Sequence, residues 1–328
     1  MVGVIVGIEV RAAPVAHVVR GGVVESVHHG HLVGLDGSGA TALSVGDPDV
    51  TLFARSSLKP LQAVAMLRAG LDLDGELLAL AAASHSGEPA HLDGVRQILE
   101  RAGLGVDDLQ NTPDVPLDPR AAVTWRGAGR PPSPLAQNCS GKHAAMLATC
   151  RAAGWDTATY RDPGHPLQQA VRATVEDLTG VPVAHTAVDG CGAPLFSSTP
   201  AGLARAFARI ATAPPGTPEG RVGAAVRAHP WWVAGTGREV VRLAAAVPGL
   251  ISKDGAEGVF AAALPDGRAV VLKVLDGSVR PVPAVVAAAL RTLGVDEPGL
   301  ASAGYTPVLG HGEPVGSVEP DVDGSAAG

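Results

Sequence analysis

Arg55-Ser56-Ser57-Leu58-Lys59-Pro60 is the stretch at which this chain changes from strand-rich to helix-rich sequence. Before it, residues 15–45 alternate in short runs of β-branched residues, and Asp36-Gly37-Ser38-Gly39 is typical of a hairpin turn between two of them. After it, residues 61–70 carry apolar side chains at helical spacing and end at a glycine, which predicts a helix with Pro60 in its first turn. Ser56 and Lys59 would then lie on one face of a helix N-terminus.

Strand character returns near the other end of the chain. Residues 258–264 and 268–275 flank the turn-forming tripeptide Pro265-Asp266-Gly267, which predicts a second antiparallel hairpin. Helical patterns fill most of the interval between the two strand-rich regions. The sequence therefore predicts an α+β fold with one antiparallel β-sheet, built from both termini and covered by helices. We expect a single domain over residues 1–328, with a frayed tail at 315–328.

The composition disfavours several classes of partner. Hydrophobic residues make up 46% of the chain and charged residues 17%, as in a globular protein with a full core. The net charge of -7 and the low aromatic content of 3% argue against binding to nucleic acid or to an anionic membrane surface. No apolar run reaches the roughly 18 residues of a membrane span, and residues 1–9 lack the basic start of a signal peptide. We expect a cytoplasmic protein with a small-molecule site.

Four polar turns interrupt a background rich in Ala and Val. They are Arg55–Lys59, Ser84-His85-Ser86-Gly87-Glu88, Asn138-Cys139-Ser140-Gly141-Lys142-His143 and Asp189-Gly190-Cys191. Small residues beside reactive groups are expected where a backbone must approach a ligand closely. Each turn alone also has an ordinary interpretation, such as a helix cap, a solvated lysine or a hydroxyl bonded to nearby backbone. The first turn is a short motif that is common in soluble chains, and its functional interpretation is that a lysine amine that accepts a proton can activate a seryl hydroxyl.

The three cysteines are too few for a disulfide framework. Cys150 lies within an apolar helical run, where a buried free thiol is expected. Cys139 and Cys191 fall in two of the polar turns, and zinc favours thiolate and imidazole ligands. Spacing alone therefore favours Cys139, His143 and Cys191 as a metal site.

Taken together and in order, six segments resemble the Rhizobium etli-type L-asparaginases, the asparaginase II family. They are the four polar turns, Arg20-Gly21-Gly22-Val23-Val24-Glu25 and His165-Pro166, and the resemblance extends to Lys253. It implies a fold similar to serine β-lactamases and glutaminases, a homodimer, and hydrolysis of L-asparagine to L-aspartate and ammonia.

The resemblance also implies particular site residues. Two serine–lysine pairs would be Ser56 with Lys59 and Ser84 with Lys253. A zinc site would be formed by Cys139, Lys142 and Cys191, so that an amine replaces the imidazole that spacing favours. For recognition of an amino acid, we expect the planar guanidinium of Arg55 to bind the α-carboxylate, Asp189 to bind the α-ammonium, and His143 to hydrogen-bond the substrate.

We predict acyl transfer through a serine ester, with Ser56 as the nucleophile and Lys59 as its base. Ser84 and Lys253 would relay protons or position water, and Ser84 as the nucleophile is the alternative within this mechanism. Two other functions remain open. One is a glutaminase or a β-lactam-acting serine–lysine hydrolase of the same fold, and the other is a non-catalytic, zinc-stabilised amino-acid-binding protein.

Overall fold

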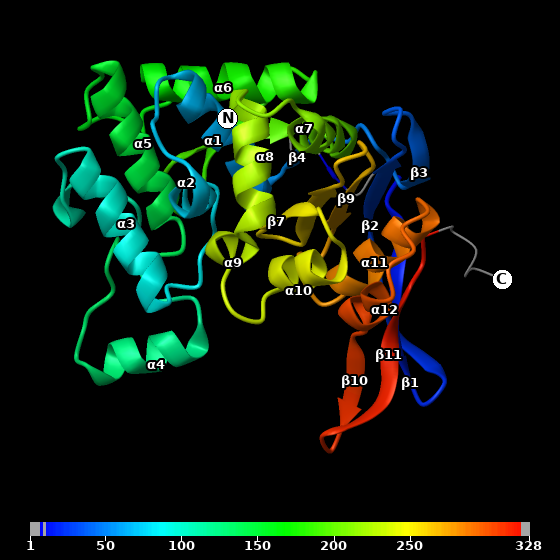
Figure 1. Ribbon diagram of the computed structural model, residues 1–328. Coiled ribbons are helices and arrows are strands. Elements are labelled where there is room, and N and C mark those ends of the chain that lie inside the picture. Colours follow the sequence, from blue (N-terminus) through cyan, green and yellow to red (C-terminus); the bar gives the residue numbers. More distant parts are fainter. Residues whose placement is uncertain (1–6, 9–10, 323–328) are drawn as a thin grey trace, which may run out of the picture.

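A large antiparallel β-sheet forms the centre of the computed structural model, which describes residues 7–8 and 11–322 (Figure 1). The strand order is β10-β11-β1-β2-β9-β8-β7, and β3 pairs with β2 beside this path. The strands are β1 (Ala13–Arg20), β2 (Val23–Leu35), β3 (Thr41–Val45), β7 (Ile251–Gly255), β8 (Val259–Ala263), β9 (Ala269–Val274), β10 (Pro307–Gly310) and β11 (Glu313–Pro320). Strands from the two ends of the chain are neighbours, because β1 pairs with β11 and β2 pairs with β9. The predicted α+β fold with a sheet built from both termini is confirmed.

The two predicted hairpins are present, as β2–β3 and β8–β9. In the second hairpin Gly267 has a φ of 95°, which L side chains rarely adopt, so the turn depends on glycine. Residues 315–320, expected in a frayed tail, belong to strand β11, whose backbone pairs with β1 on one side and β10 on the other. Residues 1–6, 9–10 and 323–328 lie outside the described part of the chain.

Helices cover the sheet and form a separate group beside it (Figure 1). They are α1 (Lys59–Arg68), α2 (Gly75–Ala81), α3 (Pro89–Arg101), α4 (Pro119–Gly127), α5 (Ser140–Ala153), α6 (Pro166–Thr179), α7 (Pro200–Thr212), α8 (Pro218–Ala228), α9 (Pro230–Val233), α10 (Glu239–Ala246), α11 (Val282–Thr292) and α12 (Gly299–Gly304), with short 3-10 turns η1 (Arg55–Leu58) and η2 (Val106–Asp108). A small sheet has the order β4 (Leu52–Phe53), β6 (Pro194–Ser198) and β5 (Thr186–Val188). Within the described residues, no helix is both long and apolar enough to cross a membrane.

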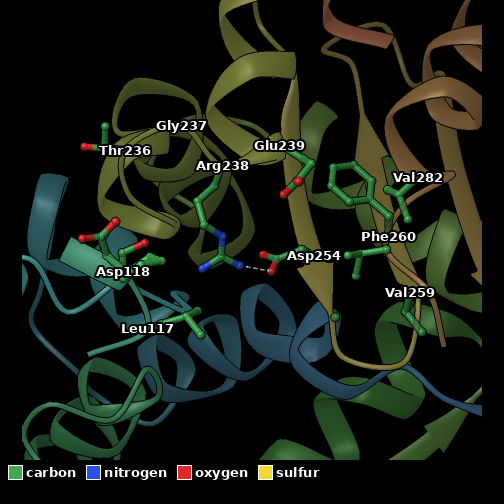
Figure 2. A pocket seen from close by; sticks show the side chains of 14 residues that line it. Leu117, Asp118, Thr236, Gly237, Arg238, Glu239, Asp254, Val259, Phe260 and Val282 are labelled. Atoms are coloured by element: carbon green, nitrogen blue, oxygen red, sulfur yellow. Dashed lines mark hydrogen bonds and ion pairs between the residues drawn. The ribbon is translucent and has the colours of Figure 1, made fainter. Parts of the chain in front are cut away.

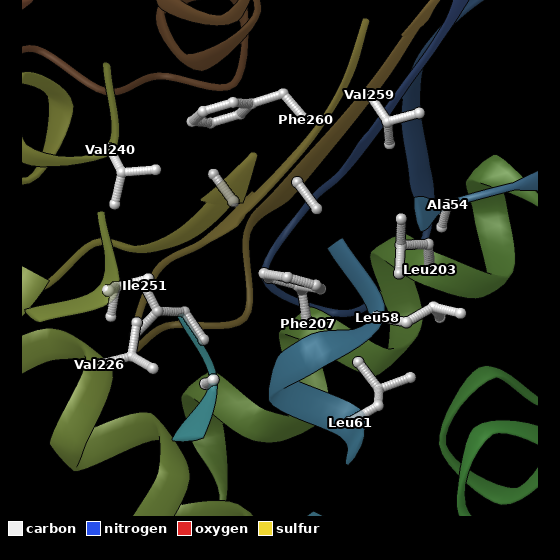
Figure 3. Close-up of a cluster of buried hydrophobic side chains, with 14 of the residues drawn as sticks. Ala54, Leu58, Leu61, Leu203, Phe207, Val226, Val240, Ile251, Val259 and Phe260 are labelled. Atoms are coloured by element: carbon white, nitrogen blue, oxygen red, sulfur yellow. The ribbon is translucent and has the colours of Figure 1, made fainter. Parts of the chain in front are cut away.

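The core joins the helical group to the sheet through apolar side chains from η1, α1, α7, β7 and β8 (Figure 3). Leu58, Leu61, Phe207, Ile251 and Phe260 are each at most 1% exposed. Full burial of such a side chain contributes roughly 1.5–3 kcal/mol relative to leaving it in water. This packing holds the start of α1 against β7, and so brings the first polar turn of the sequence beside a strand from the C-terminal half.

Candidate active site

All four polar turns meet at one place beside β7, linked by side-chain contacts. Lys59 is central to these contacts and is only 1% exposed. Its Nζ donates hydrogen bonds to the carbonyl of Ala83 at 2.6 Å, to Ser84 Oγ at 2.9 Å and to Cys139 Sγ at 3.1 Å. The lysine at the start of α1 therefore ties together the turn after α2 and the turn before α5.

Ser56 is half-buried in η1, one turn before Lys59. The Lys59 backbone N–H donates to the Ser56 carbonyl, which keeps the two residues on one helical turn. Among the described residues, the Ser56 hydroxyl has no hydrogen-bond partner, and the hydroxyl that contacts the Lys59 amine is that of Ser84. The structure thus places both serines near Lys59, with Ser56 accessible and Ser84 only 3% exposed.

Lys253 lies on β7 and is fully buried. Its Nζ donates to the Asp254 carbonyl at 2.6 Å and to the Asp254 carboxylate, and it makes no hydrogen bond to Ser84 within the described chain. Burial lowers the pKa of Lys253 to about 8, with the Asp254 charge opposing this shift and the Lys59 and Arg238 charges adding to it. Near neutral pH, a fraction of Lys253 can therefore be an uncharged amine.

Lys253 and Ser84 make no direct hydrogen bond in the described part of the chain, but Arg238 connects them through Asp254. Its guanidinium donates to the Ser84 carbonyl at 3.0 Å and pairs with the Asp254 carboxylate (Figure 2). Burial alone would raise the pKa of the Asp254 carboxyl, but the charges of Lys253 and Arg238 bring it down to about 2. Asp254 is therefore an anion between two cations.

The two cysteines of the polar turns lie together in a small buried cluster with Ala193. Lys142 Nζ donates to Cys191 Sγ at 3.2 Å. The hydrogen bond from Cys191 outweighs burial and, together with the charges of Lys59 and Lys142, holds the pKa of Cys139 well below its usual range. The same contact and burial raise the pKa of Cys191, so the pair shares one negative charge. Cys150 is a free, buried thiol elsewhere in α5, as expected.

This donor set suits a soft divalent cation, because two thiols and an amine converge in a buried space. Among the described residues, no three His, Cys, Asp or Glu side chains are grouped so that they could hold a metal ion, so a third protein ligand from this set has to be the lysine. His143, which spacing favoured, instead bonds through Nδ1 to the Tyr160 hydroxyl at 2.8 Å. Burial, with the charges of Lys142 and Lys59, lowers its pKa and keeps the imidazole neutral.

Arg55 and Asp189, the residues expected to bind the two charged groups of an amino acid, are paired with each other. Arg55 Nε donates to Asp189 Oδ1 at 2.8 Å, and Glu257 approaches the same guanidinium at 3.9 Å. Arg55 has a φ of 51°, a conformation that is costly for a residue with a side chain and is often found at functional sites. It also lines a cavity of about 720 Å³ together with Glu257 and Lys273.

A second cavity, of about 360 Å³, lies beside Arg238, Asp254 and Gly255, the last residue of β7 (Figure 2). Ser86 from the second polar turn and apolar side chains such as Phe260 complete its wall. Both ring nitrogens of His85 have protein partners: Nε2 bonds to Ser140 Oγ of the third polar turn at 2.8 Å, and Nδ1 accepts from the Gly87 backbone N–H at 3.1 Å.

Three residues of the candidate active site were not predicted from the sequence: Arg238, Asp254 and Lys273. The lysine content of the chain is a signal that could have identified Lys273 and the other lysines of this centre. The chain has four lysines in all, and each is buried: Lys59, Lys142, Lys253 and Lys273. A lysine is rarely buried unless it is paired, so a chain whose lysines are all buried indicates a candidate functional centre around them.

Comparison with known proteins gives one family match over most of the chain and several distant structural likenesses. The L-asparaginase II family matches residues 16–320, and a search of curated protein sequences finds no match. Similar solved structures include a β-lactamase from Mycobacterium bovis, at 16% identity over 81% of this chain and 95% of that chain, with a TM-score of 0.44. Others are a Bacillus glutaminase (14% identity, 75% and 83% coverage, TM-score 0.34) and a hydrolase with promiscuous acyltransferase activity (13%, 86% and 94%, 0.41).

These structural likenesses are distant. The family match, in contrast, extends from β1 to the last residue of β11 and includes all four polar turns. The chain belongs to the L-asparaginase II family.

Proposed function

We propose that this protein is an L-asparagine amidohydrolase that works through a serine ester. Family membership supports hydrolysis of an amide. The observation that carries the mechanism is the buried Lys59 amine, which lies 2.9 Å from one seryl hydroxyl and one helical turn from another. A lysine amine held beside a hydroxyl is the arrangement that activates a serine nucleophile without a histidine.

Ser56 is the nucleophile in this proposal, because its half-buried hydroxyl is open to a substrate and that of Ser84 is enclosed. In this mechanism the Lys59 ammonium first passes a proton to the relay of Ser84 and Lys253, and the free amine then accepts the Ser56 proton as Oγ bonds to the side-chain amide carbon of asparagine. The C–N bond then breaks, and the nitrogen leaves as ammonia with a proton returned from Lys59. Water next bonds to the acyl carbon as Lys59 takes one of its protons. The Oγ–C bond then breaks, Oγ takes that proton back from Lys59, and the new carboxyl group loses its own proton to solvent as L-aspartate is released.

In this proposal Ser84 and Lys253 transfer protons to and from Lys59. Ser84 is in contact with the Lys59 amine, and Lys253 has a pKa near the physiological range. A proton-transfer group works best when its pKa is close to the working pH. The first backbone N–H groups of η1, at Arg55 and Ser56, are suited to stabilise the oxyanion of the tetrahedral intermediate.

Substrate recognition in this proposal uses the Arg55–Asp189 ion pair. The α-carboxylate of asparagine binds Arg55 and the α-ammonium binds Asp189, so that the substrate replaces one internal salt bridge with two of its own. His143 offers Nε2, which is buried and has no partner among the described residues, to a polar substrate atom.

We also propose that Cys139, Lys142 and Cys191 hold a zinc ion. Zinc bound there would fix the geometry of the two turns and orient a polar substrate group. Metal content measured by mass spectrometry tests the site without reference to activity. We expect about one zinc per chain in the wild type and in Cys150→Ala, whose thiol is buried elsewhere, and little or none in Cys139→Ala or Cys191→Ala. Equal zinc content in all four proteins would contradict the site.

A homodimer and a cytoplasmic location remain predictions from the sequence. The structure offers one feature that supports self-association. The hairpin ends of β1–β2 and β10–β11 project from the sheet and carry exposed apolar side chains, including Val23, Val24 and Leu309 (Figure 1).

The proposed function is tested by comparing kcat/KM for three substrates with the same preparation of enzyme. Ammonia release from L-asparagine and from L-glutamine, and hydrolysis of the β-lactam nitrocefin, give kcat/KM for the three candidate activities. We expect the highest value for L-asparagine. A higher value for either of the others would make the protein a different hydrolase, and tight binding of asparagine without ammonia release would make it a binding protein.

A further inference from the structure

The Lys253 amine is held by its own neighbour in the chain. Asp254 offers both its carbonyl, at 2.6 Å, and its carboxylate to Lys253 Nζ. The Asp254 carboxylate is in turn held by Arg238, so the position of the buried amine depends on a residue from the segment before α10.

Arg238 also holds the turn that carries Ser84. It donates to the Ser84 carbonyl at 3.0 Å. Thr236 and Gly235, which precede it, also contact the same turn. Thr236 donates through its backbone N–H and its hydroxyl to the Glu88 carboxylate, at 2.8 Å each. Gly235 packs so closely on Ser86 that an added Cβ would lie 2.3 Å from the Ser86 hydroxyl.

Few other charges face the Lys253 amine. Lys59 approaches from α1 and Arg238 from the segment before α10, while Asp254 is the anion beside it. The neighbouring strand β8 has no ionisable residue between Val259 and Ala263, and η1 contributes the Ser57 hydroxyl, which donates to the Lys253 carbonyl at 3.0 Å. Helices α8 and α10 also pack on β7 and carry Arg227, Glu239 and Arg242, but the largest charge effects on the amine come from Asp254, Lys59 and Arg238.

We propose that Arg238 and Asp254 are positioning residues of the serine–lysine centre, which hold the Lys253 amine on β7 and fix it relative to the turn that carries Ser84. Neither side chain needs to touch the substrate. Asp254 provides the acceptors that orient the amine, and Arg238 couples strand and turn through one guanidinium. The inference rests on the proposed function, because it assigns these residues to the same centre.

Asp254 and Arg238 shift the pKa of Lys253 in opposite directions. A merely structural role would not produce opposite shifts, so this difference tests the positioning role. The Asp254 carboxylate favours the ammonium form and Arg238 disfavours it. Asp254→Asn should thus lower the pKa of Lys253 from its value of about 8, and Arg238→Gln should raise it. If neutral Lys253 is required, kcat/KM rises with pH through this pKa, so the rising limb moves to lower pH in the first variant and to higher pH in the second.

The experiment is the pH dependence of kcat/KM for L-asparagine in the wild type and both variants. We expect displacements of the rising limb by about one pH unit in opposite directions, with kcat reduced about tenfold or more and partial recovery in Arg238→Lys. The controls are Arg268→Gln and Asp266→Asn, which break a more exposed ion pair in the β8–β9 turn and should leave the profile unchanged. Displacement in the same direction, or unchanged profiles, would overturn the inference.

A second readout distinguishes failure of this inference from failure of the proposed function. Because the chain has four lysines, protein labelled with carbon-13 at the lysine ε position gives four signals, and the Lys253 signal is the one lost in Lys253→Arg. Its titration midpoint should move down in Asp254→Asn and up in Arg238→Gln whether or not asparagine is hydrolysed. An enzyme inactive on amides would remove the proposed function, whereas unmoved midpoints would remove the positioning pair.

Discussion

At the scale of single residues, the proposed mechanism depends on which seryl hydroxyl a substrate can reach. Ser56 is half-buried beside Arg55, and Ser84 is enclosed against Lys59. We predict that Ser56→Ala lowers kcat for asparagine at least about a thousandfold, because no ester can form. Ser84→Ala should lower kcat about a hundredfold through loss of proton transfer. Steady-state ammonia release measures both, and Ser44→Ala, an exposed serine on β3, is the control.

The opposite order of effects would assign the nucleophile to Ser84. If Ser84→Ala abolished turnover and Ser56→Ala retained most of it, the Lys59–Ser84 contact would be the catalytic pair itself.

The residues of the centre were easier to predict from the sequence than the contacts between them. Ser56, Lys59, Cys139 and Cys191 belong to local patterns, and a local pattern can be read without the fold. The contact of Lys59 with Ser84 depends on how α1 packs beside the turn after α2, which spacing does not encode. Arg238 was missed for the same reason, since its two partners, Ser84 and Asp254, come from different parts of the chain.

At the scale of elements, the site depends on close contact between η1 and β7. Gly255 ends β7, and a Cβ there would lie 2.6 Å from the Ala54 carbonyl and 2.9 Å from the Ser57 hydroxyl. We predict that Gly255→Ala pushes η1 away from the strand, costs about 1–3 kcal/mol in the free energy of unfolding, and lowers kcat. Chemical denaturation and the ammonia assay measure the two effects.

Gly127→Ala is the matched control for that substitution. Gly127 lies at the end of α4 with open space around its Cα, so alanine there should leave stability and activity nearly unchanged. Equal behaviour of the two variants would show that the contact between η1 and β7 does not position the catalytic groups.

The elements differ in how far their sequence reveals them. The hairpins β2–β3 and β8–β9 carry turn residues at the right spacing, and helices such as α1 and α6 have a proline at the start and apolar residues at helical intervals. Strand β11 has neither signal, because it contains a glycine and two prolines and is stabilised by its ladders with β1 and β10. Pairing between distant segments made it a strand.

At the scale of the whole molecule, the projecting end of the sheet is the candidate surface for the expected homodimer. Val23 is 66% exposed there, at the turn between β1 and β2. We predict that Val23→Asp shifts the protein toward monomer, since a charge in an apolar interface must be desolvated on association. Light scattering after size exclusion gives the mass. Val123→Asp, at a 70% exposed position on α4, should leave the dimer intact.

The overall fold class was predictable because strand-rich segments lie at both ends of the chain and helices lie between them. The order of the strands was not, since it depends on which distant edges pair, and that is decided by burial of the shared core. The position of the centre follows from the same packing, because it lies where elements from both halves of the chain meet.

The central claim is that asparagine is hydrolysed through an ester on Ser56, and the most direct measurement is mass spectrometry of enzyme quenched with acid during turnover of L-asparagine. We expect a covalent adduct with the mass of one aspartyl group, located in the peptide that contains Ser56 and absent from Ser56→Ala. Ammonia release with no such adduct on rapid quenching, or an adduct located on another residue, would contradict it.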